Sequence, residues 1–356
     1  MKKRVAVKIG SNVLAAAGGG VDLARIQQLV AQVAQLHSEG FEIIMISSGS
    51  IAAGRSLIKD NKLDVVSARQ LFSSIGQAKL ISIYRECFEE KGLLCGQVLT
   101  TKESLGTRMH YLNQRNCLSV MLEHGVVPII NENDTISVTE LMFTDNDELS
   151  GMVATMMGAE KLIILSNIDG IFNGKPGEPG VEVIREVFPG KRDLSSYIQI
   201  SKSSFGRGGM QTKTNIASKV ADEGIEVIIA NGKKDDILVH LLHDEEVVCT
   251  RFLPSDKPTT SVKKWIVHSD GFAKGEIVIN GCLKKVFEEE KAASILPIGV
   301  VRIVGNFEKG DIVKVMDEEG NQLGVGQAQY ASTLAVKNIG QKGKRPIVHY
   351  DYLYLF

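Results

Sequence analysis

Residues 4–47 read RVAVKIGSNVLAAAGGGVDLARIQQLVAQVAQLHSEGFEIIMIS, with two apolar runs on either side of a segment of helical periodicity. The runs, residues 5–9 and 43–47, are almost entirely apolar, as expected of strands buried on both faces of a sheet. Between them, residues 22–38 place their apolar side chains on one helical face and have capping residues at both ends. Two strands joined through a helix run parallel, so this segment predicts an α/β fold.

The alternation of strand-like and helix-like segments continues to residue 253. It predicts a three-layer α/β/α sandwich, with a mostly parallel sheet and helices on both faces. The further strands expected are 93–99, 126–131, 162–165 and 227–230, and the further helices lie near 66–90, 111–124, 146–157 and 210–223.

The composition changes after residue 253. Residues 254–264 are polar and contain two prolines, which is typical of a linker. Residues 265–356 carry short strand-like runs separated by glycine, which predict a small, mainly β domain. Its expected strands are 276–279, 300–304, 312–315 and 322–328, and one helix is expected near 286–293. The predicted division is a catalytic domain, 1–253, a linker, 254–264, and a second domain, 265–356.

The composition is that of an ordinary globular protein, with 44% hydrophobic and 23% charged residues in a chain of 356. No apolar run has the length of a membrane span, and no signal peptide is recognisable, so we expect a cytoplasmic protein. The five cysteines are scattered and predict reduced thiols. A formal net charge of −1 offers no general attraction to nucleic acid or to an anionic membrane.

Two turns that follow predicted strands suit anions. Lys8 and Gly10 end the first strand, where a buried lysine is costly unless it meets an anion, and where glycine lets backbone amides face a phosphate. A lysine that reaches solvent explains Lys8 equally well. Ser48 and Gly49 follow the second strand and precede a helix, whose first amides suit a carboxylate or phosphate. An ordinary strand-to-helix turn is the alternative.

Polar residues are dense after the strand that ends near residue 130. They form the runs Asn-Glu-Asn-Asp, 131–134, and Asp-Asn-Asp-Glu, 145–148. Asp134 can pair with the ammonium group of an amino acid, and asparagine both donates and accepts hydrogen bonds. Asp147 is expected in the first turn of a helix, where the helix dipole favours it. The alternative is an acidic loop followed by a capped helix.

A glycine-rich loop precedes the helix expected from residue 210. Residues 206–213 read Gly-Arg-Gly-Gly-Met-Gln-Thr-Lys, so backbone amides can surround a polyphosphate and Lys213 can reach it. The run matches neither the Walker pattern nor the dinucleotide-binding Gly-x-Gly-x-x-Gly pattern. A flexible glycine loop without a ligand is the alternative.

Together and in this order, the segments resemble the amino acid kinase superfamily, and within it the glutamate 5-kinases. The resemblance rests on residues 7–11, 47–55, 130–134, 145–150 and 208–213. The tail from about residue 276 looks like a PUA domain, especially residues 296–300 and 305–311. The resemblance covers nearly the whole chain.

The resemblance implies transfer of the ATP γ-phosphate to the γ-carboxylate of L-glutamate, giving L-glutamyl 5-phosphate in the first step of proline biosynthesis. It implies catalytic roles for Lys8, Lys213 and Asp147, in which the lysines contact the phosphates and Asp147 holds both lysines. Glutamate would contact Ser48, Gly49, Asp134 and Asn146. ATP would contact Lys8, Gly10, Ser166, Asn167, Arg207, Gly208, Gly209, Met210, Gln211, Thr212 and Lys213.

The implied chemistry needs no general base, because a carboxylate is already ionised at pH 7. Two lysines, glycine-loop amides and Mg²⁺ would support the charge of the phosphoryl transition state. Because ATP and water would hold Mg²⁺, no dedicated metal ligands are expected. The family usually has Thr-Asp where this chain has Ser166-Asn167, a small residue in place of Arg207 and an acidic residue before Pro176. All three departures concern the nucleotide side.

Two alternatives remain open. A relative that acts on N-acetylglutamate, aspartate or UMP shares the lysines and glycine loops, but a free ammonium needs an anionic partner such as Asp134, which favours glutamate. RNA binding through the PUA-like tail is the other alternative. Residues 265–356 contain 11 Lys and Arg against 11 Asp and Glu, which gives no basic footprint.

The resemblance also implies regulation and assembly. Proline is expected as an inhibitor because it resembles the α-amino and α-carboxyl ends of the substrate. We expect a homodimer or homotetramer, with residues 70–81 and 134–146 as the places for subunit contacts and inhibitor sensitivity. A glutamyl-phosphate reductase is an expected partner because the acyl phosphate is labile.

Overall fold

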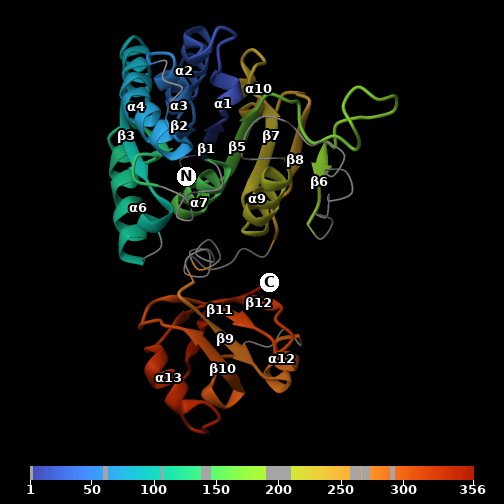
Figure 1. Cartoon of the computed structure of the whole chain (residues 1–356). Helices are drawn as coiled ribbons and strands as arrows, with labels where there is room; N and C mark the ends of the chain where they lie inside the picture. The colour runs from blue at the N-terminus through green and yellow to red at the C-terminus, as the bar shows by residue number, and fades with distance from the viewer. Residues whose placement is uncertain are drawn as a thin grey trace. The chain divides into compact units, whose positions relative to one another are not determined.

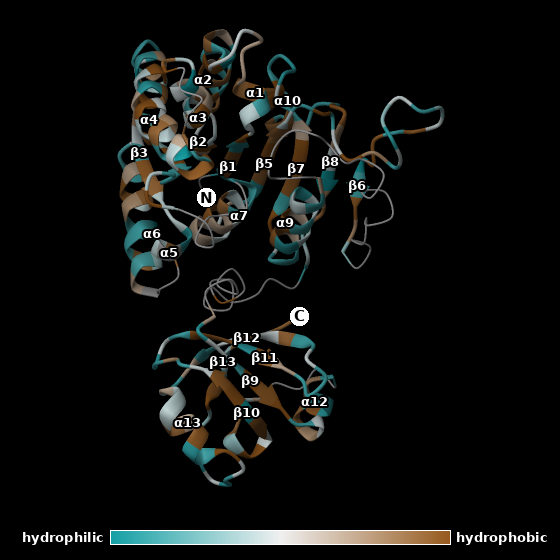
Figure 2. Cartoon of the chain, in the orientation of Figure 1, coloured by the Kyte–Doolittle hydropathy of each residue, from teal (hydrophilic) through white to brown (hydrophobic). Residues whose placement is uncertain are grey.

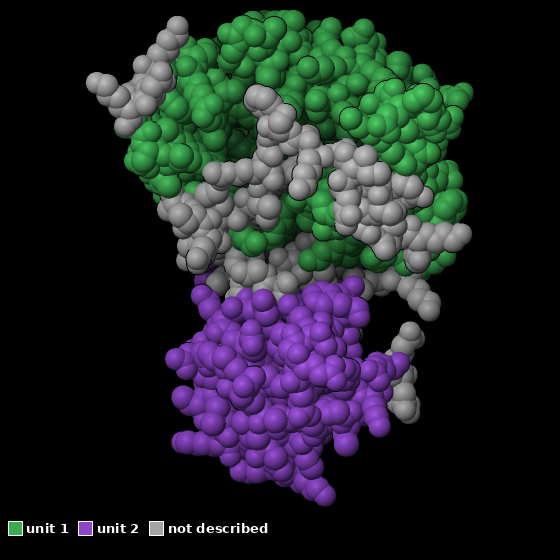
Figure 3. All heavy atoms as spheres, turned by 45° about the vertical axis from the view of Figure 1, so that its right-hand side comes forward, with its two compact units in different colours: residues 1–102, 112–258 green, residues 103–111, 259–356 purple. Residues whose placement is uncertain are grey.

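The computed structural model describes residues 3–58, 63–105, 108–137, 146–189, 210–256, 266, 273–288 and 293–356. The chain divides into two compact units, coloured separately in Figure 3. Unit 1 comprises residues 1–102 and 112–258, and unit 2 comprises residues 103–111 and 259–356. The predicted linker lies mostly outside the described residues, so the domain limits 1–253, 254–264 and 265–356 stay predictions.

Unit 1 contains a sheet of eight strands in the order β3-β4-β2-β1-β5-β7-β8-β6 (Figure 1). All described strand pairs in it are parallel except β7 with β8. The strands are β1 (Lys3–Ile9), β2 (Phe41–Ser47), β3 (Leu94–Thr100), β4 (Val126–Glu132), β5 (Lys161–Ser166), β6 (Glu186–Val187), β7 (Glu226–Asn231) and β8 (Cys249–Phe252).

Helices cover both faces of this sheet, as predicted. Helix α2 packs against both α4 and α10 on one face, and α7 and α9 pack together on the other. The helices up to residue 256 are α1 (Ser11–Leu14), α2 (Leu23–Ser38), α3 (Ser50–Arg55), α4 (Val65–Glu89), α5 (Lys102–Leu105), α6 (Arg108–Glu123), α7 (Asn146–Met157), α9 (Met210–Asp222) and α10 (Ile237–Leu242). Most of α5 and the first residues of α6 belong to unit 2 in this division.

The central strands are buried on both faces because nearly all their residues are apolar. In β5, the residues from Leu162 to Leu165 have no exposed surface, and Val7 and Ile44 in the two strands beyond it are equally buried. Figure 2 shows β5 and β7 mainly in the colours of hydrophobic residues. Helix α2 covers one face because its apolar side chains are buried in the core, and it begins where Asp22 accepts a hydrogen bond from the Arg25 amide.

Unit 2 has a separate five-stranded sheet in the order β10-β9-β11-β12-β13, antiparallel except for the pair β9 and β11. Its hydrophobic core is also separate from that of unit 1. The strands are β9 (Gly275–Ile279), β10 (Val300–Gly305), β11 (Ile312–Met316), β12 (Gln322–Ala328) and β13 (Val348–Leu355), and the helices are α12 (Gly281–Glu288), the 3₁₀ turn Pro297–Gly299 and α13 (Ser332–Asn338).

The start of the helix expected near 286–293 is wrong, because α12 begins at Gly281. Residues 289–292 lie outside the described residues, so the expected end stays a prediction. The Asn280 side chain accepts a hydrogen bond from the Leu283 amide and starts the helix five residues earlier than its apolar residues indicate. The short elements α13 and β13 were not predicted, and neither was the antiparallel strand β8. None of the helices in the described ranges is both long enough and apolar enough to cross a membrane.

Candidate active site

The candidate site lies where β1, β2, β4 and β5 end. These strands are neighbours and run parallel, so the polar residues that follow them gather at one edge of the sheet. Ser47 ends β2 opposite Ile9 in β1, and Leu165 in β5 lies opposite Ile9 on the other side. Three of the four predicted motifs therefore meet at this edge.

Asp147 is the centre of the site. Its side chain is fully buried in the first turn of α7, and its two oxygens face two lysines that come from different elements. Lys8 Nζ, on β1, lies 2.5 Å from Asp147 Oδ1, and Lys213 Nζ, on α9, lies 2.8 Å from Oδ2. The three groups together carry one excess positive charge, two ammonium groups against one carboxylate, which favours an anionic ligand at this place.

The turn after β1 differs from the prediction in one detail. The Gly10 amide donates a hydrogen bond to the Leu165 carbonyl at 3.0 Å, so it does not face a phosphate in this structure. A Cβ atom at this position would lie 3.0 Å from the same carbonyl oxygen, so a larger residue would crowd the end of β5. The Ser11 and Asn12 amides at the start of α1 have no hydrogen-bond partner within the described residues.

The Asn146 side chain joins the ends of strands β2 and β4. Its Nδ2 donates to Ser48 Oγ and to Asn131 Oδ1, both at 2.9 Å, and lies 3.3 Å from the Ser47 carbonyl. Gly49 has a φ of 110°, so the chain turns from β2 into α3 in a conformation that favours glycine. The predicted residues Ser48, Gly49 and Asn146 thus lie together next to Asp147.

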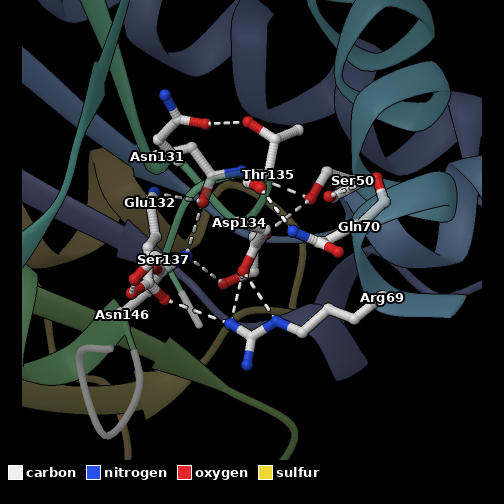
Figure 4. A network of polar contacts seen from close by, with 12 residues as sticks. Ser50, Arg69, Gln70, Asn131, Glu132, Asp134, Thr135, Ser137 and Asn146 are labelled. Carbon is white, nitrogen blue, oxygen red and sulfur yellow. Dashed lines mark hydrogen bonds and ion pairs between the residues drawn. The ribbon is translucent and has the colours of Figure 1, made fainter. Parts of the chain in front are cut away.

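Asp134, which follows β4, pairs with an arginine that the sequence did not single out (Figure 4). Arg69 Nη2 contacts Asp134 Oδ1 and lies 3.2 Å from Glu132 Oε2, and its Nε donates to Asp134 Oδ1 at 3.0 Å. Ser137 Oγ donates to the other oxygen of Glu132 at 2.7 Å. Asp134 is 8% exposed and Glu132 is 5% exposed, so this cluster of charges is largely screened from water.

Helix α4 supplies two more contacts, one to the end of β4 and one to the segment after it. Gln70 Nε2 donates to the Thr135 carbonyl at 2.8 Å, and Gln77 Oε1 accepts from Asn131 Nδ2 at 2.7 Å. Residues 70–81 were expected at subunit contacts and inhibitor sensitivity, which stays a prediction. Within the chain, two residues of this stretch, Gln70 and Gln77, contact residues of the candidate site.

The nucleotide side is described only in part. Residues 206–209, with Arg207, Gly208 and Gly209, lie outside the described residues. Helix α9 starts at Met210, and Gln211, Thr212 and Lys213 belong to its first turn. Ser166 ends β5 with 8% of its surface exposed, and its hydroxyl lies 3.5 Å from the Asn167 side chain.

Asp169, Lys234 and Asn231 form a second polar group beyond Asn167, which sequence reasoning missed. Lys234 Nζ lies 2.8 Å from Asp169 Oδ1, and Asn231 Nδ2 donates to the same oxygen at 3.2 Å. The hydrogen bond from Lys234 lowers the pKa of Asp169, against the opposing effect of partial burial. Asp169 lies two residues after Asn167, so the sequence alone could have indicated a charged residue close to the predicted nucleotide site.

No group of three or more histidine, cysteine, aspartate or glutamate side chains suited to a metal ion occurs among the described residues. The cationic character of the Lys8 and Lys213 pair instead fits the phosphates of a nucleotide, which bring their own divalent cation.

The comparisons with known proteins cover nearly the whole chain. The model of the amino acid kinase family matches residues 3–231, and the PUA domain model matches residues 275–350. The glutamate 5-kinase of Bacteroides thetaiotaomicron is 64% identical over 354 residues, which cover 99% of this chain and 98% of that protein. The chain belongs to the amino acid kinase family, among its glutamate 5-kinases. The resemblance found in the motifs is confirmed.

Other members of the glutamate 5-kinases match over the same length. That of Chlorobaculum tepidum is 41% identical over 355 residues, 99% of this chain and 97% of that protein. A solved UMP kinase from Bacillus anthracis has a TM-score of 0.51 at 16% identity and covers 70% of this chain and 96% of that chain, which supports the shared fold alone. The predicted fold class, an α/β kinase domain with a mainly β PUA domain, is confirmed.

Proposed function

We propose that this chain is an enzyme that transfers the γ-phosphate of ATP to the γ-carboxylate of L-glutamate and forms L-glutamyl 5-phosphate. The observation that supports this most is the buried Asp147 carboxylate, which places the Lys8 and Lys213 ammonium groups at the sheet edge beside Ser48 and Asn146. Two ammonium groups beside neutral hydrogen-bond donors suit a site that binds two anionic substrates next to each other. The similarity to glutamate 5-kinases identifies those anions as ATP and glutamate.

In the proposed reaction, Lys8 and Lys213 stabilise the phosphoryl oxygens from two sides. The attacking γ-carboxylate is ionised at neutral pH, so no proton has to be removed from it. Catalysis then depends on alignment of the two substrates and on positive charge held ready for the transition state. The Asp147 carboxylate offsets the electrostatic repulsion between the two ammonium groups and holds both at fixed positions.

Glutamate is proposed to bind between Ser48, Gly49, Asn146 and Asp134. The hydroxyl of Ser48 and the amide of Asn146 suit carboxylate oxygens, and Asp134 suits the α-ammonium group. Asn146 already donates to Ser48 and Asn131, so its orientation is fixed before the substrate arrives.

ATP is proposed to bind with Lys8, Gly10, Ser166, Asn167 and the loop and helix start formed by Arg207, Gly208, Gly209, Met210, Gln211, Thr212 and Lys213. Since the Gly10 amide is engaged by Leu165, the amides of Ser11 and Asn12 suit the phosphates better. Mg²⁺ is proposed to arrive with ATP and to neutralise part of its phosphate charge. Asp169, which pairs with Lys234, is the charged residue nearest in sequence to Ser166-Asn167.

The proposal is tested by the release of ADP from Mg-ATP in the presence of glutamate, N-acetylglutamate, aspartate or UMP. Glutamate should give the highest kcat/KM, because Asp134 suits a free ammonium and an acetylated amine has none. Faster turnover with N-acetylglutamate, aspartate or UMP would keep the family and refute the acceptor.

We further propose a role in proline biosynthesis, in the cytoplasm, with inhibition by proline and with assembly into a homodimer or homotetramer. A glutamyl-phosphate reductase is a proposed partner, because an acyl phosphate hydrolyses readily. Unit 2, the PUA domain, is proposed to be structural or regulatory rather than to bind nucleic acid. Light scattering at micromolar concentration tests the assembly, and a monomeric mass would refute it.

A further inference from the structure

Arg69 lies between two carboxylates at the end of β4. Its guanidinium contacts Asp134 through both Nε and Nη2 and contacts Glu132 through Nη2. The arginine comes from α4, and the two carboxylates follow one another two residues apart (Figure 4). All three side chains are shielded, since the exposed fractions are 16% for Arg69, 8% for Asp134 and 5% for Glu132.

The two oxygens of Asp134 are used unequally. Both contacts from Arg69 go to Oδ1. In the described part of the chain, the contact to Oδ2 is one hydrogen bond from Ser50 Oγ, at 3.4 Å, near the limit for such a bond. A carboxylate oxygen can accept about two hydrogen bonds, so Oδ2 retains capacity for a strong donor.

The Oδ2 side of Asp134 suits a cation. A carboxylate that is only 8% exposed is costly to bury unless strong donors complete its hydrogen bonding. The α-ammonium of an amino acid is such a cation, and it would meet Asp134 at the oxygen that Arg69 leaves free.

We propose that Arg69 is the positioning residue for substrate specificity: it holds Asp134 so that Oδ2 points to the α-ammonium of glutamate. This inference rests on the proposed function, since it assigns the amine end of the same substrate. Without Arg69, the carboxylates of Asp134 and Glu132 would repel each other and Asp134 would lose its fixed orientation. The kinase would then discriminate poorly between glutamate and a diacid without an amine.

The planar fork of arginine explains why this residue suits the position. Nε and Nη2 contact one carboxylate oxygen while Nη2 reaches the second carboxylate, which fixes the relative orientation of both. A lysine would carry the same charge but only as a point, so it should orient Asp134 less well. A comparison of lysine with an uncharged residue at position 69 therefore separates the effect of the positive charge from the effect of the orientation of Asp134.

The test compares two variants, Arg69→Met and Arg69→Lys, with glutamate and with glutarate, which is glutamate without its amino group. Arg85→Met is the matched control, since Arg85 lies on the same helix with 60% of its side chain exposed. The readouts are kcat and KM for each acceptor and KM for ATP. Thermal melting of each variant shows that it is folded.

We expect Arg69→Met to raise the KM for glutamate by about tenfold or more, with a smaller change in kcat, because the lost orientation affects binding of the amine. Glutarate turnover and the KM for ATP should change less than about threefold. Arg69→Lys should recover part of the loss, and Arg85→Met should behave as the unaltered chain.

An equal loss with glutamate and glutarate in both Arg69 variants would overturn the inference and assign Arg69 a purely structural role. Unchanged kinetics in Arg69→Met would also overturn it. If the unaltered chain does not phosphorylate glutamate at all, the proposed function itself fails, and this outcome is distinct from the other two.

Discussion

Asp147 carries its charge in a place that water does not reach. The residue has no exposed surface, yet it faces the ammonium groups of Lys8 and Lys213. A buried charge with two partners is costly to disturb, because removal of one member leaves the others unpaired. Asp147 therefore matters to stability as well as to the proposed catalysis.

Replacement Asp147→Asn should remove the anion that holds both lysines. We expect kcat to fall about 100-fold or more, since the ammonium groups lose their positions. We also expect the free energy of unfolding to fall by about 3 kcal/mol. Urea denaturation and steady-state kinetics measure the two effects.

Asp22→Asn is the matched control for this change. Asparagine caps helices as well as aspartate does, so the Asp22 cap on α2 should persist and both quantities should stay nearly unchanged. A fully active Asp147→Asn variant would contradict the role proposed for the residue.

The cysteines should differ in reactivity because their surroundings differ. Burial raises the pKa of Cys95 to about 11 and also raises the pKa of Cys87 and Cys249, whereas Cys117 and Cys282 are exposed. Iodoacetamide at pH 8 should therefore modify Cys117 and Cys282 first, since the thiolate is the reactive form. Mass spectrometry of digests measures the order, and early modification of Cys95 in the folded chain would contradict it.

The sequence predicted some site residues and not others. Ser48 could be predicted because it directly follows a strand, Lys8 because a lysine is unusual near the end of an apolar strand, and Asn146 and Asp147 because they lie in a dense polar run at a helix start. Arg69 could not be predicted, since it lies inside a long helix. Its partner lies 65 residues away, and only the packing of α4 brings the two together.

At the scale of elements, α3 and α4 approach each other unusually closely. A Cβ at Gly76 would lie 1.8 Å from the Ser50 carbonyl oxygen, and a Cβ at Gly54 would lie 1.9 Å from the Phe72 carbonyl oxygen. These two glycines let the helix backbones touch. The contact brings Ser50 on α3 next to the α4 residues that line the site.

Gly76→Ala should push the two helices apart, because backbone atoms cannot give way as a flexible side chain can. We expect a loss of about 1–3 kcal/mol in the free energy of unfolding and a higher KM for glutamate, with the KM for ATP less affected. Calorimetry and kinetics measure these effects.

Gly18→Ala is the control, since a Cβ there meets no atom within 4 Å. The variant should match the unaltered chain in melting temperature and in both KM values. A Gly76→Ala variant as stable as this control would show that the helices can separate without cost.

Elements with strong apolar periodicity were predicted well, and elements set by local capping were not. Helix 146–157 has the predicted limits, and β5 extends the predicted strand by one residue at each end. The start of α12 depends on the Asn280 cap, and β8 depends on pairing with β7, which joins residues far apart in sequence. Neither the cap nor the pairing alters the hydrophobic pattern.

At the scale of the whole molecule, the chain has two units with separate cores. The stability of each unit should therefore depend on the charged groups buried within that unit. In unit 2, Asp317 accepts hydrogen bonds from Lys284 at 2.9 Å and from the Asn321 side chain at 3.0 Å. These contacts, with Lys284 the largest contributor, hold the pKa of Asp317 well below its usual range.

A lowered pKa means that the folded state favours ionised Asp317. Its contribution to stability is therefore present above the unfolded pKa, about 3.9, and is lost as the pH falls through the lower folded value. Asp317→Asn should lower the melting temperature of unit 2 at pH 7 and should matter less as the pH falls below about 4. Scanning calorimetry of the full chain at several pH values measures this, and an effect that does not depend on pH would contradict it.

The most direct test of the proposed reaction is the formation of γ-glutamyl hydroxamate from Mg-ATP, L-glutamate and hydroxylamine, by the unaltered chain and by Lys213→Ala. Hydroxylamine traps the acyl phosphate, so the product reports transfer to the carboxylate rather than ATP hydrolysis. Hydroxamate should form only with glutamate, and its yield should fall about 100-fold or more in the variant. Hydrolysis of ATP without hydroxamate, or an equal yield from Lys213→Ala, would contradict the proposed reaction.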